Sequence, residues 1–203
     1  MIKRLLLWLA TAGALAAMLG VGGAAAAPTT VTCGDSITAP GDYVLAGDCT
    51  WSRAFAIVIM ASNVELALDG HTVTGVFGAF SGIAAQGVSG LHIEGPGTIT
   101  GFEHFGVGFA DVSRSSIEQV TTNDDGVGIF LTGSPGSSAN VLTGNTATNN
   151  RSTGIDVASG TGNRIVGNTA LSNGVDLADH NAGCDQNKWN GNVFVTANQS
   201  CIH

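Results

Sequence analysis

The sequence predicts an all-β solenoid, in which short strands and turns wind into coils that stack on one another. The segment that begins at Asn140 is repeated from Asn163, and both copies contain Gly-Asn-Thr-Ala followed by a Gly-Ile/Val-Asp-Val/Leu stretch. Gly-Asn pairs begin at positions 144, 167 and 191, and this nearly constant interval is typical of solenoids. Apolar and polar residues alternate within each copy in runs too short for an ordinary helix, which indicates strands.

The segment 1–26 has the pattern of a secretory signal peptide. A basic start precedes an apolar run from Leu5 to Ala17, and small residues lead to Pro28. We predict cleavage after Ala26, which leaves a single solenoid domain at 27–203. The alternative, an uncleaved membrane anchor, is less consistent with an apolar run shorter than the ~20 residues of a membrane span. We therefore expect a secreted protein, extracellular or periplasmic, without a membrane span after signal removal.

The mature chain is expected to be strongly acidic. The full sequence has 7 Lys and Arg residues against 15 Asp and Glu residues, a net charge of −8. Lys3 and Arg4 leave with the signal peptide, so 5 of the 7 basic residues remain and the net charge approaches −10. Nucleic acids and anionic membrane surfaces attract basic patches, so we expect neither as a partner.

Four cysteines form two local pairs, Cys33 with Cys49 near the mature N-terminus and Cys184 with Cys201 near the C-terminus. Disulfides persist in exported proteins. Coils of a solenoid are about 4.8 Å apart, so its two ends lie well beyond the ~7 Å Cα separation that a bridge tolerates. We therefore predict the bridges Cys33–Cys49 and Cys184–Cys201, one at each end. The Cys-x-x-Cys spacing typical of a zinc site does not occur.

Between these bridges the elements follow in order. Residues 30–52 predict an N-terminal cap with a turn at Pro40-Gly41, and Val64, Leu66 and Leu68 alternate in an early core strand. From Ser81 the units become regular and open with Gly82-Ile83, Gly106-Val107, Gly128-Ile129, Gly154-Ile155 and Gly174-Val175. A second set of apolar landmarks, at positions 64, 91, 117, 141, 165 and 189, recurs at a similar interval. These landmarks predict six to seven coils.

Asn145, Asn168 and Asn192 fall at equivalent places in successive coils. Asparagine suits turns, so we interpret this row as a structural ladder. A flat, regular threonine array is what an ice-binding β-solenoid needs. The sequence does not predict one, because these threonines do not recur at one period: Thr72, Thr74, Thr98, Thr100, Thr143 and Thr146.

Segments at both ends of the mature chain resemble a known group of proteins. Residues 33–45, Cys-Gly-Asp-Ser-Ile-Thr-Ala-Pro-Gly-Asp-Tyr-Val-Leu, and residues 61–75, Ala-Ser-Asn-Val-Glu-Leu-Ala-Leu-Asp-Gly-His-Thr-Val-Thr-Gly, resemble the first coils of secreted right-handed parallel β-helix repeat proteins. Residues 187–202 resemble the last coil of the same group. The resemblance implies a single-stranded right-handed parallel β-helix of the pectin-lyase-like superfold. Polysaccharide lyases, hydrolases, epimerases, copper-site maturation factors and proteins without known activity share that fold, so it does not by itself imply a function.

Two aspartates occupy the most informative outward positions. In Gly154-Ile-Asp156-Val and Gly174-Val-Asp176-Leu the apolar neighbours point inward, so we expect both carboxylates on one outer face, one above the other. When two carboxylates lie so close together, either the pKa of one of them is raised or the pair binds a cation. Asp156 and Asp176 are therefore candidates for a calcium site, and no other cofactor is expected.

Further polar residues are expected in the turns beside this pair. Together with the two stacked aspartates, Asp124 and Asp125 are the candidate catalytic acids, and Asn150 and Arg151 are candidate ligand contacts. The alternative is that all of these residues simply occupy turns and a solvated sheet face.

The register of the preceding coil stays open. The Gly-Val-Gly-Ile stretch at 126–129 can be aligned in two ways, so the outward neighbour of Asp156 is either Gly128 or Phe130. Phe130 would offer an aromatic platform to a ligand, whereas Gly128 would offer a flat floor.

The catalytic motifs of enzymes with this fold are incomplete. Of the polygalacturonase motifs only Asp124-Asp125 occurs, and Arg151 and Arg164 match the base of pectate lyases by position alone. We therefore predict a monomeric, non-catalytic protein that binds polysaccharide or a cell-surface partner. The alternative is a small polysaccharide lyase or glycoside hydrolase that uses the acidic cluster. A structural envelope component is a third hypothesis, against which the disulfide-bridged ends argue, because they block edge pairing.

Overall fold

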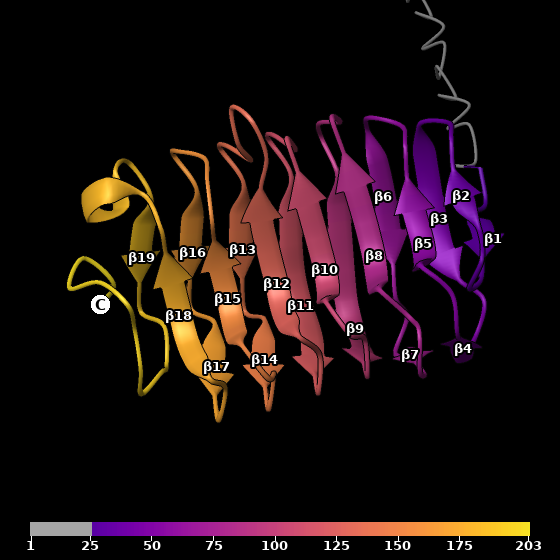
Figure 1. The fold of residues 1–203 in the computed structure, drawn as a ribbon. Coiled ribbons are helices and arrows are strands. Elements are labelled where there is room, and N and C mark those ends of the chain that lie inside the picture. The colour runs from indigo at the N-terminus through magenta and orange to yellow at the C-terminus, as the bar shows by residue number, and fades with distance from the viewer. Residues whose placement is uncertain (1–25) are drawn as a thin grey trace, which may run out of the picture.

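The computed structural model describes residues 26–203, whose regular structure is almost entirely β-strand (Figure 1). The predicted signal peptide, residues 1–26, lies outside the described residues except for its last position. One short 3-10 helix, η1, spans Ala182–Cys184. The strands are β1 (Thr29–Val31), β2 (Ser36–Ile37), β3 (Gly41–Leu45), β4 (Cys49–Trp51), β5 (Phe55–Ile59), β6 (Val64–Ala67), β7 (Thr72–Gly75), β8 (Ser81–Gln86), β9 (His92–Thr100), β10 (Phe105–Ala110), β11 (Ser116–Asn123), β12 (Val127–Thr132), β13 (Val141–Thr143), β14 (Thr146–Thr148), β15 (Thr153–Val157), β16 (Arg164–Val166), β17 (Thr169–Leu171), β18 (Val175–Asp179) and β19 (Lys188–Asn190).

The strands form two parallel sheets that wind around a common core. The seven-stranded sheet has the order β2-β5-β8-β10-β12-β15-β18, and a 12-stranded sheet contains the others. Strands β9 and β11 each extend over two faces, because β6 and β7 both pair with β9 while β13 and β14 both pair with β11. Each coil therefore has three faces. The predicted parallel β-solenoid is confirmed, with about six turns.

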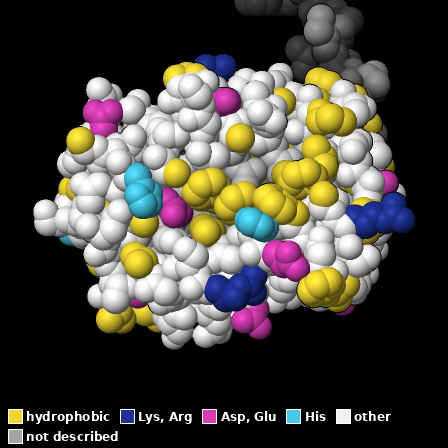
Figure 2. Space-filling model, in the orientation of Figure 1, with side chains coloured by type: hydrophobic (Ala, Val, Ile, Leu, Met, Phe, Trp, Pro, Cys, Tyr) yellow, Lys and Arg dark blue, Asp and Glu magenta, His cyan; other side chains and the backbone are white. Residues whose placement is uncertain are grey.

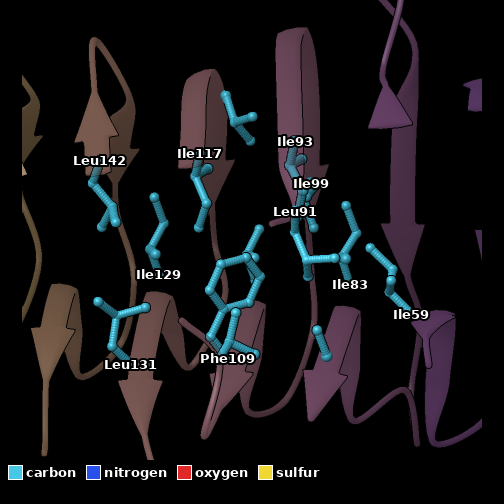
Figure 3. Packing of buried hydrophobic residues seen from close by; sticks show 14 of the residues in the cluster. Ile59, Ile83, Leu91, Ile93, Ile99, Phe109, Ile117, Ile129, Leu131 and Leu142 are labelled. Carbon is cyan, nitrogen blue, oxygen red and sulfur yellow. The ribbon is translucent and has the colours of Figure 1, made fainter. Parts of the chain in front are cut away.

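The core is a set of inward-facing rows that continue from coil to coil. One row pairs its members in register and buries all of them completely: Ile57, Ile83, Val107, Ile129, Ile155 and Leu177. Figure 3 shows Ile83, Ile129 and Leu142 among the side chains that fill the space between the sheets. β-Branched residues suit strands, and each buried aliphatic side chain stabilises the fold by about 1.5 to 3 kcal/mol.

The predicted asparagine ladder is confirmed. The Asn145 backbone N–H donates to Asn168 Oδ1 at 2.9 Å, and the Asn168 N–H donates to Asn192 Oδ1 at 3.0 Å. The side-chain amide of each of these asparagines also donates to a backbone carbonyl of another coil. A second ladder of the same kind runs through Asn140, Asn163 and Asn187. The asparagine side chains thus pair backbone N–H and C=O groups of the turns that are buried away from water.

Both predicted disulfides are present. Cys33–Cys49 closes the N-terminal coil with a Cα separation of 5.8 Å, and Cys184–Cys201 joins η1 to the C-terminal segment with a Cα separation of 6.0 Å. Within residues 26–203, no helix has the length and apolar character needed to cross a bilayer.

Candidate functional site

The outer side of the seven-stranded sheet carries a groove. One outward row crosses β5, β8, β10, β12, β15 and β18 in register and contains Val58, Ala84, Gly108, Phe130, Asp156 and Ala178. Because Ala84 and Gly108 are small, the middle of this row is hollow, and the groove there has a volume of about 500 Å³. Met60, Gln86 and Thr132 also line it.

Phenylalanine residues make up a large part of the lining, and we call this site the aromatic groove. Phe105 and Phe130 are stacked, with ring centroids 4.5 Å apart and planes inclined by 4°. Phe80 contacts Phe55 and Phe105 edge-on, with centroids 5.6 and 5.9 Å away. The imidazole of His104 stacks on Phe80 at 3.9 Å. Figure 2 shows a band of hydrophobic side chains across this face, with histidine and acidic side chains near it.

Phe130, not Gly128, is the outward neighbour of Asp156, which decides the register that the sequence left open. The predicted ligand contact Phe130 therefore lies in the wall of the groove, and Asp156 lies one strand beyond it. Alignment from the sequence could not decide this, because both registers place an apolar residue inward.

Asp156 and His180 lie close together near one end of the outward row that crosses the groove. The side chain of Asp156 is only 11% exposed, and its Oδ1 lies 3.3 Å from His180 Nε2. Burial raises the pKa of the Asp156 carboxyl, and the neighbouring His180 acts in the opposite direction. His180 was not among the site residues proposed from the sequence, because its place near the second disulfide favoured a capping or exposed histidine, and Asp179 was the residue considered as its partner.

The expected stacking of Asp156 on Asp176 is wrong, because Ala178 is the residue paired with Asp156. The repeated Gly-x-Asp stretches suggested that Thr153 lies opposite Asn173, whereas the sheet pairs Thr153 with Val175. The two Gly-x-Asp stretches are 20 residues apart in the sequence, whereas the coil between β15 and β18, which contains β16 and β17, places residues 22 apart opposite each other.

Asp176 is buried in strand β18, where both oxygens of its carboxylate accept hydrogen bonds. Oδ1 accepts hydrogen bonds from the Asn173 N–H and side-chain amide, and Oδ2 accepts from the N–H groups of Val195 and Thr196. Burial acts to raise the pKa of Asp176, but these hydrogen bonds outweigh it and lower the pKa. The pair of adjacent carboxylates on which the calcium hypothesis rested is therefore absent.

Asp125 occupies a buried ladder position rather than an open cleft. Its Oδ1 accepts from the Phe102 N–H at 2.9 Å, and its own N–H donates to Asn150 Oδ1 at 3.0 Å. Its Oδ2 is buried without a hydrogen-bond partner. Burial raises the pKa of Asp125 to about 8, against the opposing effects of the Phe102 N–H and the Arg151 guanidinium. Its neighbour Asp124 is exposed in a turn with φ of 62°.

The two predicted ligand contacts in these turns already have partners in the protein. Asn150 is buried, and its amide donates to Asn173 Oδ1 at 2.9 Å. Arg151 donates to the carbonyl oxygens of Phe102, Glu103 and Asp124, and thereby joins the turns of successive coils. Neither residue lines the aromatic groove.

The four candidate acids thus lie in separate environments. Asp156 flanks the groove, Asp176 is buried in β18, Asp125 is buried in a bend, and Asp124 is on the surface. Paired acid/base catalysis requires two carboxyl groups on either side of one bond. The use of these acids in a reaction remains a prediction from the sequence.

Comparison with known proteins links most of the chain to one family. Residues 38–200 match a family described as periplasmic copper-binding protein (NosD). No curated protein and no solved structure gives a significant match to the chain.

The described side chains of this protein do not fit a resident copper centre. Copper in proteins is held by several converging His, Cys, Met or carboxylate ligands. In the part of the chain from 26 to 203, no group of three or more His, Cys, Asp or Glu side chains is arranged to hold a metal ion. The four cysteines of this part are all in disulfides, and its one methionine, Met60, lines the aromatic groove.

Proposed function

Because this chain belongs to the NosD family, whose proteins are periplasmic β-helix repeat proteins, we propose that it is a non-catalytic periplasmic binding protein that takes an extended apolar segment of a partner protein into the aromatic groove. The aromatic groove is the single observation that carries the proposal. A concave apolar surface with a few polar groups at its margin is typical of ligand sites, and contiguous exposed apolar patches mark interaction surfaces. The export expected from the sequence agrees with the periplasmic location of the family.

The dimensions of the groove suit a short extended peptide. From Val58 to Phe130 it crosses four paired strands, a distance of about 14 Å at about 4.8 Å per strand. A peptide in strand conformation rises about 3.3 Å per residue, so the groove accommodates about four residues. Small residues at Ala84 and Gly108 leave room for apolar side chains of the partner.

The lining favours a peptide over a polysaccharide. A sugar ring packs against an open aromatic face and needs hydrogen-bonding groups around it, but Phe105 and Phe130 cover one face of each other. The Ser81 hydroxyl already donates to the Phe105 carbonyl at 3.0 Å. Gln86 and Thr132 are the remaining polar side chains of the groove. Polysaccharide binding, which we predicted from the sequence, is therefore the alternative.

Charge indicates what should flank the apolar segment. The whole chain has a net charge of −8, and Asp156 lies beyond the Phe130 end of the groove. Complementary charge speeds association and disfavours wrong partners. We therefore expect a lysine or arginine next to the apolar residues of the partner, and we expect lipids with anionic headgroups to be repelled.

Filling the groove should weaken binding strongly. We propose measuring fluorescence anisotropy of labelled eight-residue peptides with four central Val, Leu or Phe residues and either two Lys or two Glu residues at one end. Ala84→Trp should weaken binding of the Lys peptide about tenfold or more, because loss of one buried apolar side chain costs about 1.5 to 3 kcal/mol. Ala67→Trp is the matched control, since Ala67 is a half-buried outward residue of β6 outside the groove.

Three results would contradict the proposal: no binding by the unaltered protein, equal affinity in Ala84→Trp, or equal weakening in the control. Asp156→Asn should reduce the preference for Lys over Glu peptides without abolishing binding. In parallel, uronic-acid and neutral glycans should be incubated with the protein. Glycan products that disappear in Asp156→Ala would support the lyase or hydrolase alternative instead.

A further inference from the structure

A second face of the solenoid carries two regular ranks of threonine. It is formed by β4, β7, the C-terminal halves of β9 and β11, β14 and β17, which run along the lower side of the stack in Figure 1. The first rank pairs Thr72, Thr98, Thr121, Thr146 and Thr169 in register. The second rank pairs Thr50, Thr74, Thr100, Asn123, Thr148 and Leu171. We call these eleven positions the threonine face.

The threonine face corrects the expectation that the threonines form no array. The intervals between successive members of the first rank differ from coil to coil, so no single period connects them in the sequence. The strands nevertheless stay in register, because the extra residues are accommodated in turns elsewhere in each coil. The register of β11 against β9 changes between Glu118 and Val120, because Glu118 pairs with Glu94 but Val120 pairs with Gly97.

The face has the geometry of a two-dimensional lattice. Neighbouring coils lie about 4.8 Å apart, and outward residues i and i+2 of one strand lie about 6.6 Å apart. Threonine is β-branched and therefore rotationally restricted, so its hydroxyl and methyl groups repeat at nearly fixed positions. The residues between the ranks, such as Val73, Ile99 and Ala147, point inward and are completely buried, which holds the surface in place.

The threonine face is also free of charge, unlike the face beside it. None of its eleven positions carries an ionisable side chain. At its N-terminal edge the carboxylate of Asp48 accepts a hydrogen bond from the Thr72 N–H. The adjacent outward rows of the same sheet contain Glu65, His92, Glu94, Glu118, Arg164 and Lys188. Ionic groups would orient water around themselves, whereas hydroxyl and methyl groups in alternation leave water free to adopt a lattice.

We propose that the threonine face binds ice. Its two repeat distances are close to those of water on the prism face of hexagonal ice, so the hydroxyl groups and the trough between the ranks hold water in an ice-like arrangement. This activity is independent of the aromatic groove, which lies on the other sheet. Five paired threonines span about 19 Å at about 4.8 Å per coil, which is a small contact area, and Asn123 and Leu171 interrupt the second rank. We therefore expect modest thermal hysteresis with clear inhibition of ice recrystallisation.

The test uses the mature protein and three variants. Thr121→Lys places a charge in the middle of the first rank and should reduce inhibition of recrystallisation about tenfold, the effect expected for a central contact of a complementary surface. Thr143→Lys is the matched control, because Thr143 is exposed on the same sheet but belongs to the neighbouring charged face. Leu171→Thr extends the second rank and should increase activity. Circular-dichroism melting of each variant establishes that it is folded.

Failure of the folded, unaltered protein to shape ice crystals or inhibit their recrystallisation would overturn the proposal. Equal activity of Thr121→Lys and Thr143→Lys would also overturn it. Sedimentation with crystalline cellulose and chitin forms a further arm: binding to either polymer that Thr121→Lys abolishes, without any effect on ice, would assign the face to a crystalline polysaccharide and contradict ice binding.

Discussion

Asp125→Asn should stabilise the protein at alkaline pH and remove most of the decline in stability that we expect of the unaltered protein between about pH 4 and pH 8. The carboxyl of Asp125 is completely buried, and its Oδ2 has no hydrogen-bond partner. Its pKa of about 8 in the folded protein lies far above the value of about 3.9 expected in an unfolded chain. The folded state therefore prefers the protonated carboxyl.

The sign of the effect follows from proton linkage. Above about pH 4 the unfolded state releases this proton, whereas the folded state retains it until about pH 8. The contribution of Asp125 to stability is therefore greatest below about pH 4 and falls as pH rises through this window. The full shift corresponds to about 6 kcal/mol, and relaxation around the carboxylate makes about 2 to 5 kcal/mol a realistic gain for Asp125→Asn at pH 9.

Asparagine also suits the position structurally. Asn150 and Asn173 occupy the same ladder in the following coils, and the Asn150 amide donates to Asn173 Oδ1. An amide at position 125 can donate to Asn150 Oδ1 in the same way, which the ionised carboxylate cannot do.

Guanidinium unfolding, followed by circular dichroism at several pH values with the disulfides intact, measures this difference. Asp124→Asn is the matched control, because Asp124 is the adjacent but exposed carboxylate. Its effect should stay within about 0.5 kcal/mol. Identical pH slopes for Asp125→Asn and the unaltered protein would show that the buried carboxyl does not control alkaline stability.

Asn145→Leu is expected to cause the largest loss of stability, because it removes hydrogen bonds from several buried groups at once. Asn145 Oδ1 accepts from the Val120 N–H at 3.0 Å, and its amide donates to the Ile117 carbonyl at 2.8 Å and to Asn168 Oδ1 at 2.9 Å. Leucine has a similar volume but leaves these buried groups without partners. Each unsatisfied buried group costs about 1 to 3 kcal/mol, so we expect a total loss of about 3 to 6 kcal/mol.

The same unfolding measurement tests this expectation. Asn190→Leu serves as the control, because Asn190 is exposed in β19, and surface substitutions typically change stability by less than about 0.5 kcal/mol. A loss in Asn145→Leu no greater than that in Asn190→Leu would mean that water replaces the ladder hydrogen bonds.

Local patterns in the sequence were sufficient to predict the fold and its disulfide bridges. Alternating apolar residues such as Val64, Leu66 and Leu68 specify strands, and the Gly-Asn period specifies coils. Once coils are assumed, their spacing allows only the bridges Cys33–Cys49 and Cys184–Cys201, which the structure contains. The Asn145 ladder was predictable for the same reason, because its members keep a nearly constant separation in the sequence.

The functional surfaces could not be predicted in this way. The expected Asp156–Asp176 pair does not exist, whereas Asp156 meets Phe130 and His180. The aromatic groove depends on where Phe105 and Phe130 stack, and the threonine face depends on residues that no common period links.

The sequence alone therefore determined that this protein is a parallel β-solenoid with a disulfide at each end, because alternation and repetition are properties of consecutive residues. Only the tertiary structure decided which outward side chains are neighbours. Register between coils is set by hydrogen bonds between strands, and turns of unequal length change the number of residues from one coil to the next without disturbing those bonds. If the register between two strands shifts by two residues, inward residues still face inward, but every outward residue gains a different neighbour.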